Sequence, residues 1–208
     1  MTSESSVSVV TIGCNGRDAH LYNRPHYARQ SSTPVVMTEL ARLYAQITLL
    51  RKKPQDVPAS ALLLVLTALA HFVLNLALGI MFPPIPGPLA ALLAVYTVVT
   101  VIWYAGLLQL TGKPERFLQT TTAVFGFQLV LTPLSVLSDW LLRRFSEDTT
   151  WQFPIALIFF VVLAWTIAVN SHVVKAALEW STASSVALVI LQVIVMQLVL
   201  FTLFPAAR

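Results

Sequence analysis

Charged residues and cysteine are scarce in this sequence of 208 residues. Only 11% of the residues are charged, whereas 57% are hydrophobic, and soluble domains carry roughly 25% charged residues. A single cysteine, Cys14, excludes an internal disulfide framework and any multi-cysteine metal site. Because the apolar residues gather in long runs, the scarcity of charge indicates that a lipid bilayer surrounds most of the chain.

The motifs of common enzyme classes are missing as well. The sequence contains no HExxH, no Walker phosphate-binding loop, no GxSxG and no paired carboxylates within an apolar run. The net charge of +4 comes from cations beside the apolar runs, which argues against nucleic acid as a partner. We therefore expect a protein that is not an enzyme, with no catalytic residue, no metal ion and no cofactor.

Five apolar runs occupy most of the chain, at about 60–82, 89–110, 117–140, 153–176 and 184–204. Each run has the ~20 residues that a helix needs to cross ~30 Å of hydrocarbon at 1.5 Å per residue. The sequence thus predicts an all-α fold, a polytopic helical membrane protein. Its five transmembrane helices form one domain over residues 59–205, in contact with the lipid bilayer.

Two further segments precede the first run. Residues 1–36 are polar and poor in large apolar residues, which predicts a disordered tail. Alternatively, translation starts at Met37 and the tail is not part of the protein. Residues 37–53 carry apolar side chains at helical spacing, with Thr38 as N-cap and cations at 51–53 in the last turn. This pattern predicts an amphipathic interfacial helix, and a helix docked on the cytoplasmic ends of the spans explains it equally well.

The basic residues predict the orientation of the spans. All but three of the 13 Lys and Arg residues fall before the first run or beside the second and fourth loops; the exceptions are Arg143, Arg144 and Arg208. Since loops rich in Lys and Arg stay in the cytoplasm, we expect a cytoplasmic N-terminus and a C-terminus across the membrane. The cations expected to contact lipid headgroups are Arg42, Arg51, Lys52, Lys53, Lys113 and Arg116.

Polar residues lie close to the midpoints of the predicted spans. The candidate midplane polar layer consists of His71, Asn75, Gln128, Thr166 and Gln192, with Thr100 at the same depth. Polar groups in hydrocarbon need partners, so we expect hydrogen bonds between helices, with a neutral His71 bonded to Gln128 or Gln192. A proton relay or a substrate site around His71 is the alternative.

The third run follows a short basic motif. Residues 112–117, Gly112-Lys113-Pro114-Glu115-Arg116-Phe117, have the form GKPxxF, and the span continues with Gly126-Phe127 and Pro133. This combination resembles the Yip1 family of five-span membrane proteins, particularly its bacterial members. Phe127 stands where the family often has tyrosine, and the acidic-Leu-Tyr-Gly-Pro element of eukaryotic members is missing before the first span. The resemblance implies a bacterial inner membrane protein with a cytoplasmic N-terminus and a periplasmic C-terminus.

Two functional hypotheses follow. The leading one is a non-enzymatic integral membrane protein that acts through helix packing, homo-oligomerisation or contact with lipid or other membrane proteins. The alternative is a small transporter or channel subunit that uses the midplane polar layer around His71. Five spans give no even inverted repeat within one chain, although an antiparallel dimer would supply one.

Overall fold

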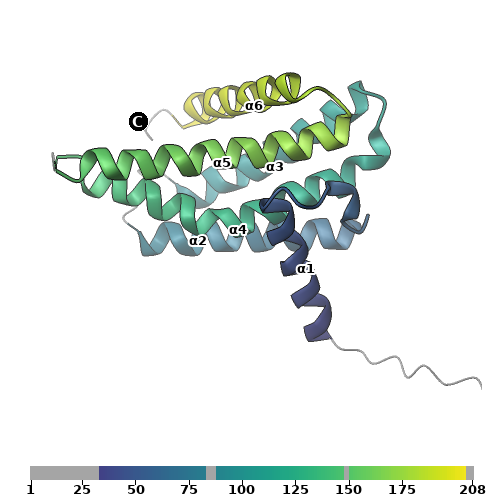
Figure 1. Cartoon of the computed structure of the whole chain (residues 1–208), viewed down its shortest axis with the longest axis horizontal. Coiled ribbons are helices and arrows are strands. Elements are labelled where there is room, and N and C mark those ends of the chain that lie inside the picture. Colours follow the sequence, from purple (N-terminus) through teal and green to yellow (C-terminus); the bar gives the residue numbers. More distant parts are fainter. Residues whose placement is uncertain (1–32, 83–87, 148–149, 205–208) are drawn as a thin grey trace, which may run out of the picture. The chain divides into compact units, whose positions relative to one another are not determined.

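The computed structural model describes residues 33–82, 88–147 and 150–204, and all regular structure in these ranges is helical. The all-α prediction is therefore confirmed for the described residues (Figure 1). The helices, including two short 3₁₀ helices labelled η, are α1 (Thr33–Thr48), η1 (Pro54–Asp56), α2 (Ala61–Met81), α3 (Leu89–Leu110), η2 (Pro114–Arg116), α4 (Phe117–Arg144), α5 (Gln152–Leu178) and α6 (Thr182–Leu203).

Helices α2 to α6 are long and apolar enough to cross a membrane, as the five runs predicted. They lie side by side in Figure 1, and their ends agree closely with the predicted runs, except that α4 continues to Arg144. Helix α4 also runs on through Pro133, although proline cannot donate to the helix ladder. The chain is thus an integral membrane protein with five spans.

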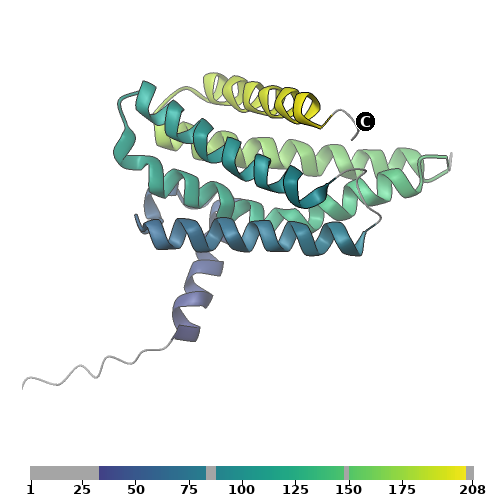
Figure 2. The same ribbon diagram turned by 180° about the vertical axis from the view of Figure 1, so that it is seen from behind.

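Helix α4 lies in the middle of the bundle. Its most apolar stretch is 56% buried inside the protein, whereas those of the other four spans are only 11 to 17% buried. It packs against α2, α3 and α5, and α6 packs against α5 and α3 (Figures 1 and 2). The segment Thr120–Phe127 is buried throughout, and its small threonine and alanine side chains, together with Gly126, let the neighbouring helices approach closely. The outer helices turn large apolar side chains outward, as lipid contact requires.

Helix α1 is docked on the bundle through its C-terminal half. Tyr44 and Ile47 are buried in the core together with Val57, which follows η1. The Tyr44 hydroxyl lies 3.0 Å from the Thr67 hydroxyl of α2. Since Thr67 donates its own proton to the Leu63 carbonyl, Tyr44 is the donor. The C-terminal half of α1 thus packs against α2 and α4, whereas contact of this helix with the membrane surface stays a prediction.

The ring of Tyr44 lies directly on Gly126 of α4. A Cβ atom at Gly126 would overlap the ring, so only glycine leaves room for the tyrosine. Burial raises the pKa of the Tyr44 phenol above its usual value of 10, which keeps the group neutral. The contact fixes α1 to the central span, whereas the N-terminal half of α1 projects away from the bundle (Figure 1).

The boundaries of α1 differ from the prediction. The helix begins at Thr33, so the predicted N-cap at Thr38 is wrong and Thr38 lies inside the helix. Of the predicted tail, residues 33–36 belong to α1, and residues 1–32 lie outside the described part of the chain. Because the helix ends at Thr48, the cations at 51–53 do not close its last turn.

A Schellman turn ends α1. Leu50 has a left-handed backbone with φ of 59°. Its N–H donates to the Ile47 carbonyl and that of Arg51 donates to the Gln46 carbonyl, both at 2.9 Å. Glycine usually occupies the left-handed position, so a leucine there gave no signal in the sequence.

Replacing Gly126 by alanine should loosen α1. The added methyl group overlaps the Tyr44 ring, and overpacking a filled core costs roughly 1–3 kcal/mol. We expect faster amide hydrogen exchange in residues 40–48 of the variant.

The matched control is Gly106→Ala in α3, because a Cβ atom there meets nothing within 4 Å. In a Tyr44→Ala background, Gly126→Ala should have little further effect, since the overlapping ring is gone. An undiminished effect in that background would contradict the contact.

Candidate functional site

The first half of the GKPxxF motif ends α3 and starts η2. Gly112 has φ of 70°, a conformation that glycine adopts without strain. The N–H of Gly112 donates to the Gln109 carbonyl, and that of Lys113 donates to the Leu108 carbonyl at 2.8 Å, forming a second Schellman turn. Pro114 then begins η2. The glycine and the proline therefore have structural roles in the turn.

The two cations of the motif bind the C-terminal end of α5. The Lys113 ammonium donates to the Leu178 carbonyl at 3.0 Å and to the Glu179 carboxylate at 2.7 Å. The Arg116 guanidinium donates to the Ala177 carbonyl at 2.9 Å and to the other Glu179 oxygen at 2.7 Å. We call Lys113, Arg116 and Glu179 the clasp.

A third segment completes this helix end. The last four carbonyls of a helix have no partner within it. At α5, the Lys175 carbonyl accepts from the Glu179 N–H, and the Ala176 carbonyl accepts from the Gln55 side chain of η1 at 2.6 Å. With the clasp, all four carbonyls are satisfied. Two cations at a helix C-terminus also interact favourably with the negative end of the helix dipole.

Glu179 is the member of the clasp that sequence reasoning missed. Its backbone is left-handed, with φ of 60°, directly after the last residue of α5. Hydrogen bonds from Lys113 and Arg116, together with their charges, lower the pKa of its carboxyl group to about 2. The signal available in the sequence was an acidic residue directly after one predicted span, together with two cations in the loop before another.

The clasp changes the interpretation of two predicted headgroup contacts. The side chains of Lys113 and Arg116 are only 22% and 26% exposed, because they are bound to α5. Headgroup contact by these two cations stays a prediction. The other four cations named above are exposed residues of α1 and the segment that follows it.

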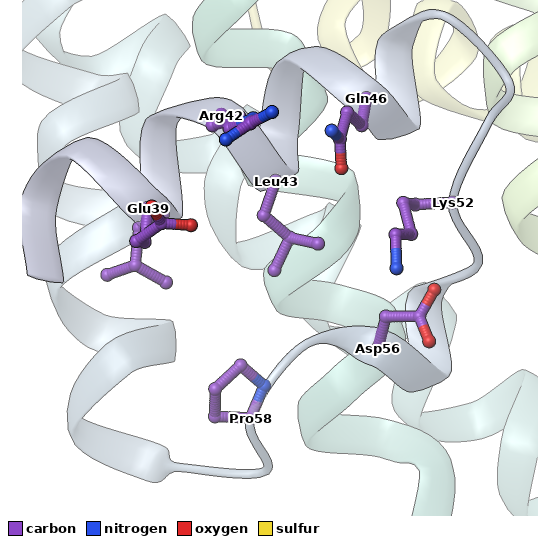
Figure 3. Close-up of a pocket in the computed structure, with 8 residues that line it drawn as sticks. Glu39, Arg42, Leu43, Gln46, Lys52, Asp56 and Pro58 are labelled. Carbon is purple, nitrogen blue, oxygen red and sulfur yellow. The ribbon is translucent and has the colours of Figure 1, made fainter.

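A pocket of about 590 Å³ lies between α1 and the segment that leads to α2 (Figure 3). Arg42 on α1 and Lys52 on the connecting segment line it, and neither has an ion pair with any described residue. Its other lining residues are Glu39, Leu40, Leu43, Gln46, Asp56 and Pro58. The pocket thus combines two cations and two carboxylates with an apolar wall.

The predicted midplane layer divides into two hydrogen-bonded groups, each centred on a tyrosine of α3. Gln128 donates to the Tyr96 hydroxyl at 2.9 Å. The Tyr104 hydroxyl lies 2.8 Å from the Asn170 amide and 3.0 Å from the Gln192 amide. Both partner atoms are amide oxygens, so the single phenol proton is shared between two acceptors. These bonds join α3 to α4, α5 and α6.

His71 does not make the predicted hydrogen bond. It is only 4% exposed, its Nδ1 atom has no hydrogen-bond partner, and its ring packs against Phe125 and Tyr96, at centroid distances of 5.5 and 6.1 Å. Gln128 and Gln192 bond to the tyrosines instead. Asn75 and Thr166 donate to carbonyls of their own helices.

The two tyrosines were missed because an aromatic residue in an apolar run looks like ordinary core. A signal was nevertheless present, since Tyr96, Thr100 and Tyr104 follow each other at four-residue spacing and so lie along one face of α3. Asn170, which we did not place in the layer, belongs to the Tyr104 group.

Two cavities flank the hydrogen bond between Gln128 and Tyr96. One, of about 220 Å³, lies between α2, α3, α4 and α5 and is lined by His71, Asn75, Leu93, Tyr96, Phe127, Gln128, Leu131, Thr132, Ser135 and Thr166. The other, of about 200 Å³, lies between α3, α4, α5 and α6. Tyr96, Phe127, Gln128 and Thr166 line both.

The described residues contain no group of three or more His, Cys, Asp or Glu side chains that could hold a metal ion. Comparison with models of known protein families, with curated protein sequences and with solved structures finds no significant match.

Replacing Glu179 by glutamine should weaken the clasp in a pH-dependent way. The carboxyl pKa is lower in the folded state, about 2, than its ordinary value of 4.5. The ion pairs therefore stabilise the fold above about pH 4.5, and this contribution is lost as the pH falls toward 2. We expect wild type to have a higher thermal unfolding temperature in detergent than Glu179→Gln at pH 7, with the difference shrinking below pH 4.

Glu115→Gln is the matched control, because this exposed carboxylate reaches Arg116 only at 4.0 Å. Its unfolding temperature should follow wild type at every pH. A difference between wild type and Glu179→Gln that is constant with pH would argue against an ionised Glu179.

Proposed function

We propose that this chain is a non-enzymatic protein of a bacterial inner membrane that acts through lipid and partner contacts at the α1 end of the bundle. The observation that carries the proposal is the docking of α1. Tyr44 fixes this helix on Gly126, while Arg42 and Lys52 line the pocket and form no ion pair with another described residue. A firmly held surface that carries cations suits recognition at the membrane surface.

The chemistry of the pocket favours a zwitterionic phospholipid headgroup. Arg42 and Lys52 supply donors for a phosphate, and charge-assisted hydrogen bonds of this kind are among the stronger ones. Glu39 and Asp56 offer acceptors for the amine of the same headgroup. Leu43 points into the pocket from α1 and provides apolar surface for the glycerol region (Figure 3).

The distribution of charge supports an orientation with α1 in the cytoplasm. Of the nine described Lys and Arg residues, only Arg143 and Arg144 lie at the opposite end of the bundle. The positive-inside rule then gives a cytoplasmic N-terminus and a periplasmic C-terminus. The same orientation is implied by the resemblance to the Yip1 family.

The structural roles of the GKPxxF residues support a Yip1-like arrangement. Gly112 ends α3, Pro114 starts η2, and Lys113 and Arg116 hold α5. Phe117 packs against the hydrophobic core. The motif therefore forms the turn between α3 and α4 and ties it to the end of α5, which supports a turn-forming role of the kind the Yip1 resemblance implies. Oligomerisation with a second copy of the chain is part of the same proposal.

Reporter fusions test the orientation. Fusions after Pro88 and Arg208 should report the periplasm, and fusions after Lys113 and Lys175 should report the cytoplasm, because five spans place alternate loops on opposite sides. A cytoplasmic signal at Arg208 would contradict the proposed topology.

Removing the pocket cations should weaken phospholipid binding. We expect Arg42→Gln combined with Lys52→Gln to reduce retention of phosphatidylethanolamine in native mass spectrometry. The affinity should fall tenfold or more, since each charge-assisted hydrogen bond contributes about 1.5–3 kcal/mol.

Arg51→Gln is the control, because Arg51 is also an exposed cation but does not line the pocket. It should retain the lipid as wild type does. Equal losses in the control and the double variant would show that the net charge matters rather than the pocket.

A further inference from the structure

A second pocket lies beside the clasp, at the same end of the bundle as α1. Its volume is about 720 Å³, within the range of roughly 300–1,000 Å³ that is typical of pockets for small ligands. One wall comes from the end of α5 and its cap residue, whose lining side chains are His172, Lys175, Ala176 and Glu179. Further walls come from the segment around η1, from η2 and from the residue that follows the α5 cap.

Two hydrogen bonds hold the segment around η1 against α5. The Gln55 side chain donates to the Ala176 carbonyl at 2.6 Å, and the Nε2 atom of His172 lies 3.3 Å from the Lys52 carbonyl oxygen. Val57, directly after η1, is buried in the core. The pocket is thus held in shape by the protein itself, which lowers the entropy cost of binding a ligand.

The pocket has an excess of positive charge. Lys53 and Lys175 are exposed and form no ion pair with any described residue, and the Lys175 ammonium donates to the neutral Thr182 hydroxyl at 2.9 Å. The clasp contributes one positive charge, since two cations surround one carboxylate. The two lysines contribute two more and Asp56 removes one, so the pocket and the clasp together carry a net charge of +2 with His172 neutral.

This charge distinguishes the second pocket from the first. In the first pocket Arg42 and Lys52 are balanced by Glu39 and Asp56, which suits a zwitterionic headgroup. Asp56 lines both pockets, but the other carboxylate of the second one is already bound by the clasp. An anionic ligand therefore gains more from the second pocket than a zwitterionic one does.

Trp180 indicates the depth of the second pocket in the membrane. It lines the pocket, is 40% exposed and comes two residues after Leu178, where the span α5 ends. Indole rings favour the headgroup level of a bilayer. Basic pockets between spans at the cytoplasmic side are the kind that bind anionic lipid headgroups. The position of this pocket thus favours an anion that the membrane supplies.

We propose that this second pocket binds the phosphate of an anionic phospholipid, such as phosphatidylglycerol. Lys53 and Lys175 donate to the phosphate oxygens, and Arg116 adds positive charge while its guanidinium stays bound to Glu179. The inference rests on the proposed function in placing lipid at this end of the bundle. The two pockets share none of their cations, so separate variants test them and either proposal can fail without the other.

Native mass spectrometry of the full-length protein with added phosphatidylglycerol tests the site. We expect Lys53→Gln combined with Lys175→Gln to lower the affinity for this lipid tenfold or more, because two charge-assisted contacts to the phosphate are lost. Lys53→Arg combined with Lys175→Arg should retain the lipid, since arginine keeps both the charge and the donors.

The matched control is Arg51→Gln combined with Arg144→Gln. It removes the same charge from two exposed residues, neither of which lines the pocket, and should bind phosphatidylglycerol as wild type does. An excess of inorganic phosphate should leave the lipid bound to wild type, because a free anion lacks the rest of the lipid. The thermal unfolding temperature of each variant in detergent should stay close to that of wild type.

Three results would overturn the proposal. Equal losses of phosphatidylglycerol in the glutamine variant and the control mean that net charge matters rather than the pocket. A loss in the arginine variant as large as in the glutamine variant means that the two positive charges do not hold the lipid. Displacement by inorganic phosphate means that the pocket binds a soluble anion. Phosphatidylethanolamine retention by the Arg42, Lys52 variant is measured separately, so failure of the first pocket is distinguishable from failure of the second.

Discussion

The carbonyl groups at the C-terminal end of α5 need hydrogen-bond donors, and three separate segments meet there to supply them. Gln55 comes from η1, Lys113 and Arg116 come from the loop before α4, and Glu179 holds the two cations in place. A helix leaves its last four carbonyls without partners of its own, and side chains from the neighbouring segments bind them here. One requirement of the backbone therefore ties together the loops at one end of the bundle.

Polar side chains in the middle of the bundle also need hydrogen-bond partners, and tyrosines provide them. The Tyr104 hydroxyl of α3 donates toward amide oxygens of α5 and α6, and the Tyr96 hydroxyl accepts from the amide of Gln128 on α4. Such bonds contribute modestly in membranes, about 0.6 kcal/mol on average, yet they orient the helices relative to one another. His71 lies outside these hydrogen-bonded groups and packs its ring against Phe125 and Tyr96 instead.

The proposed functions use two pockets at the end of the bundle where α1 lies. Helix α1 is held by Tyr44, which packs on Gly126 and bonds to Thr67, and by the buried Ile47, and its charged residue Arg42 lines the first of these pockets. Neither proposal uses the two midspan cavities, which lie on either side of the hydrogen bond between Tyr96 and Gln128.

The sequence by itself determined the class of the fold, the number of spans and their approximate ends, because the length and composition of an apolar run are local properties. It also singled out Gly112, Lys113 and Gly126 without revealing what each does. Only the tertiary structure decided that Lys113 binds α5, that Tyr44 fills the space at Gly126, and that Gln128 and Gln192 pair with tyrosines instead of His71. Hydrophobicity positions a residue at a depth in the membrane, but the partner of a polar group depends on helix rotation and packing, which no single run encodes.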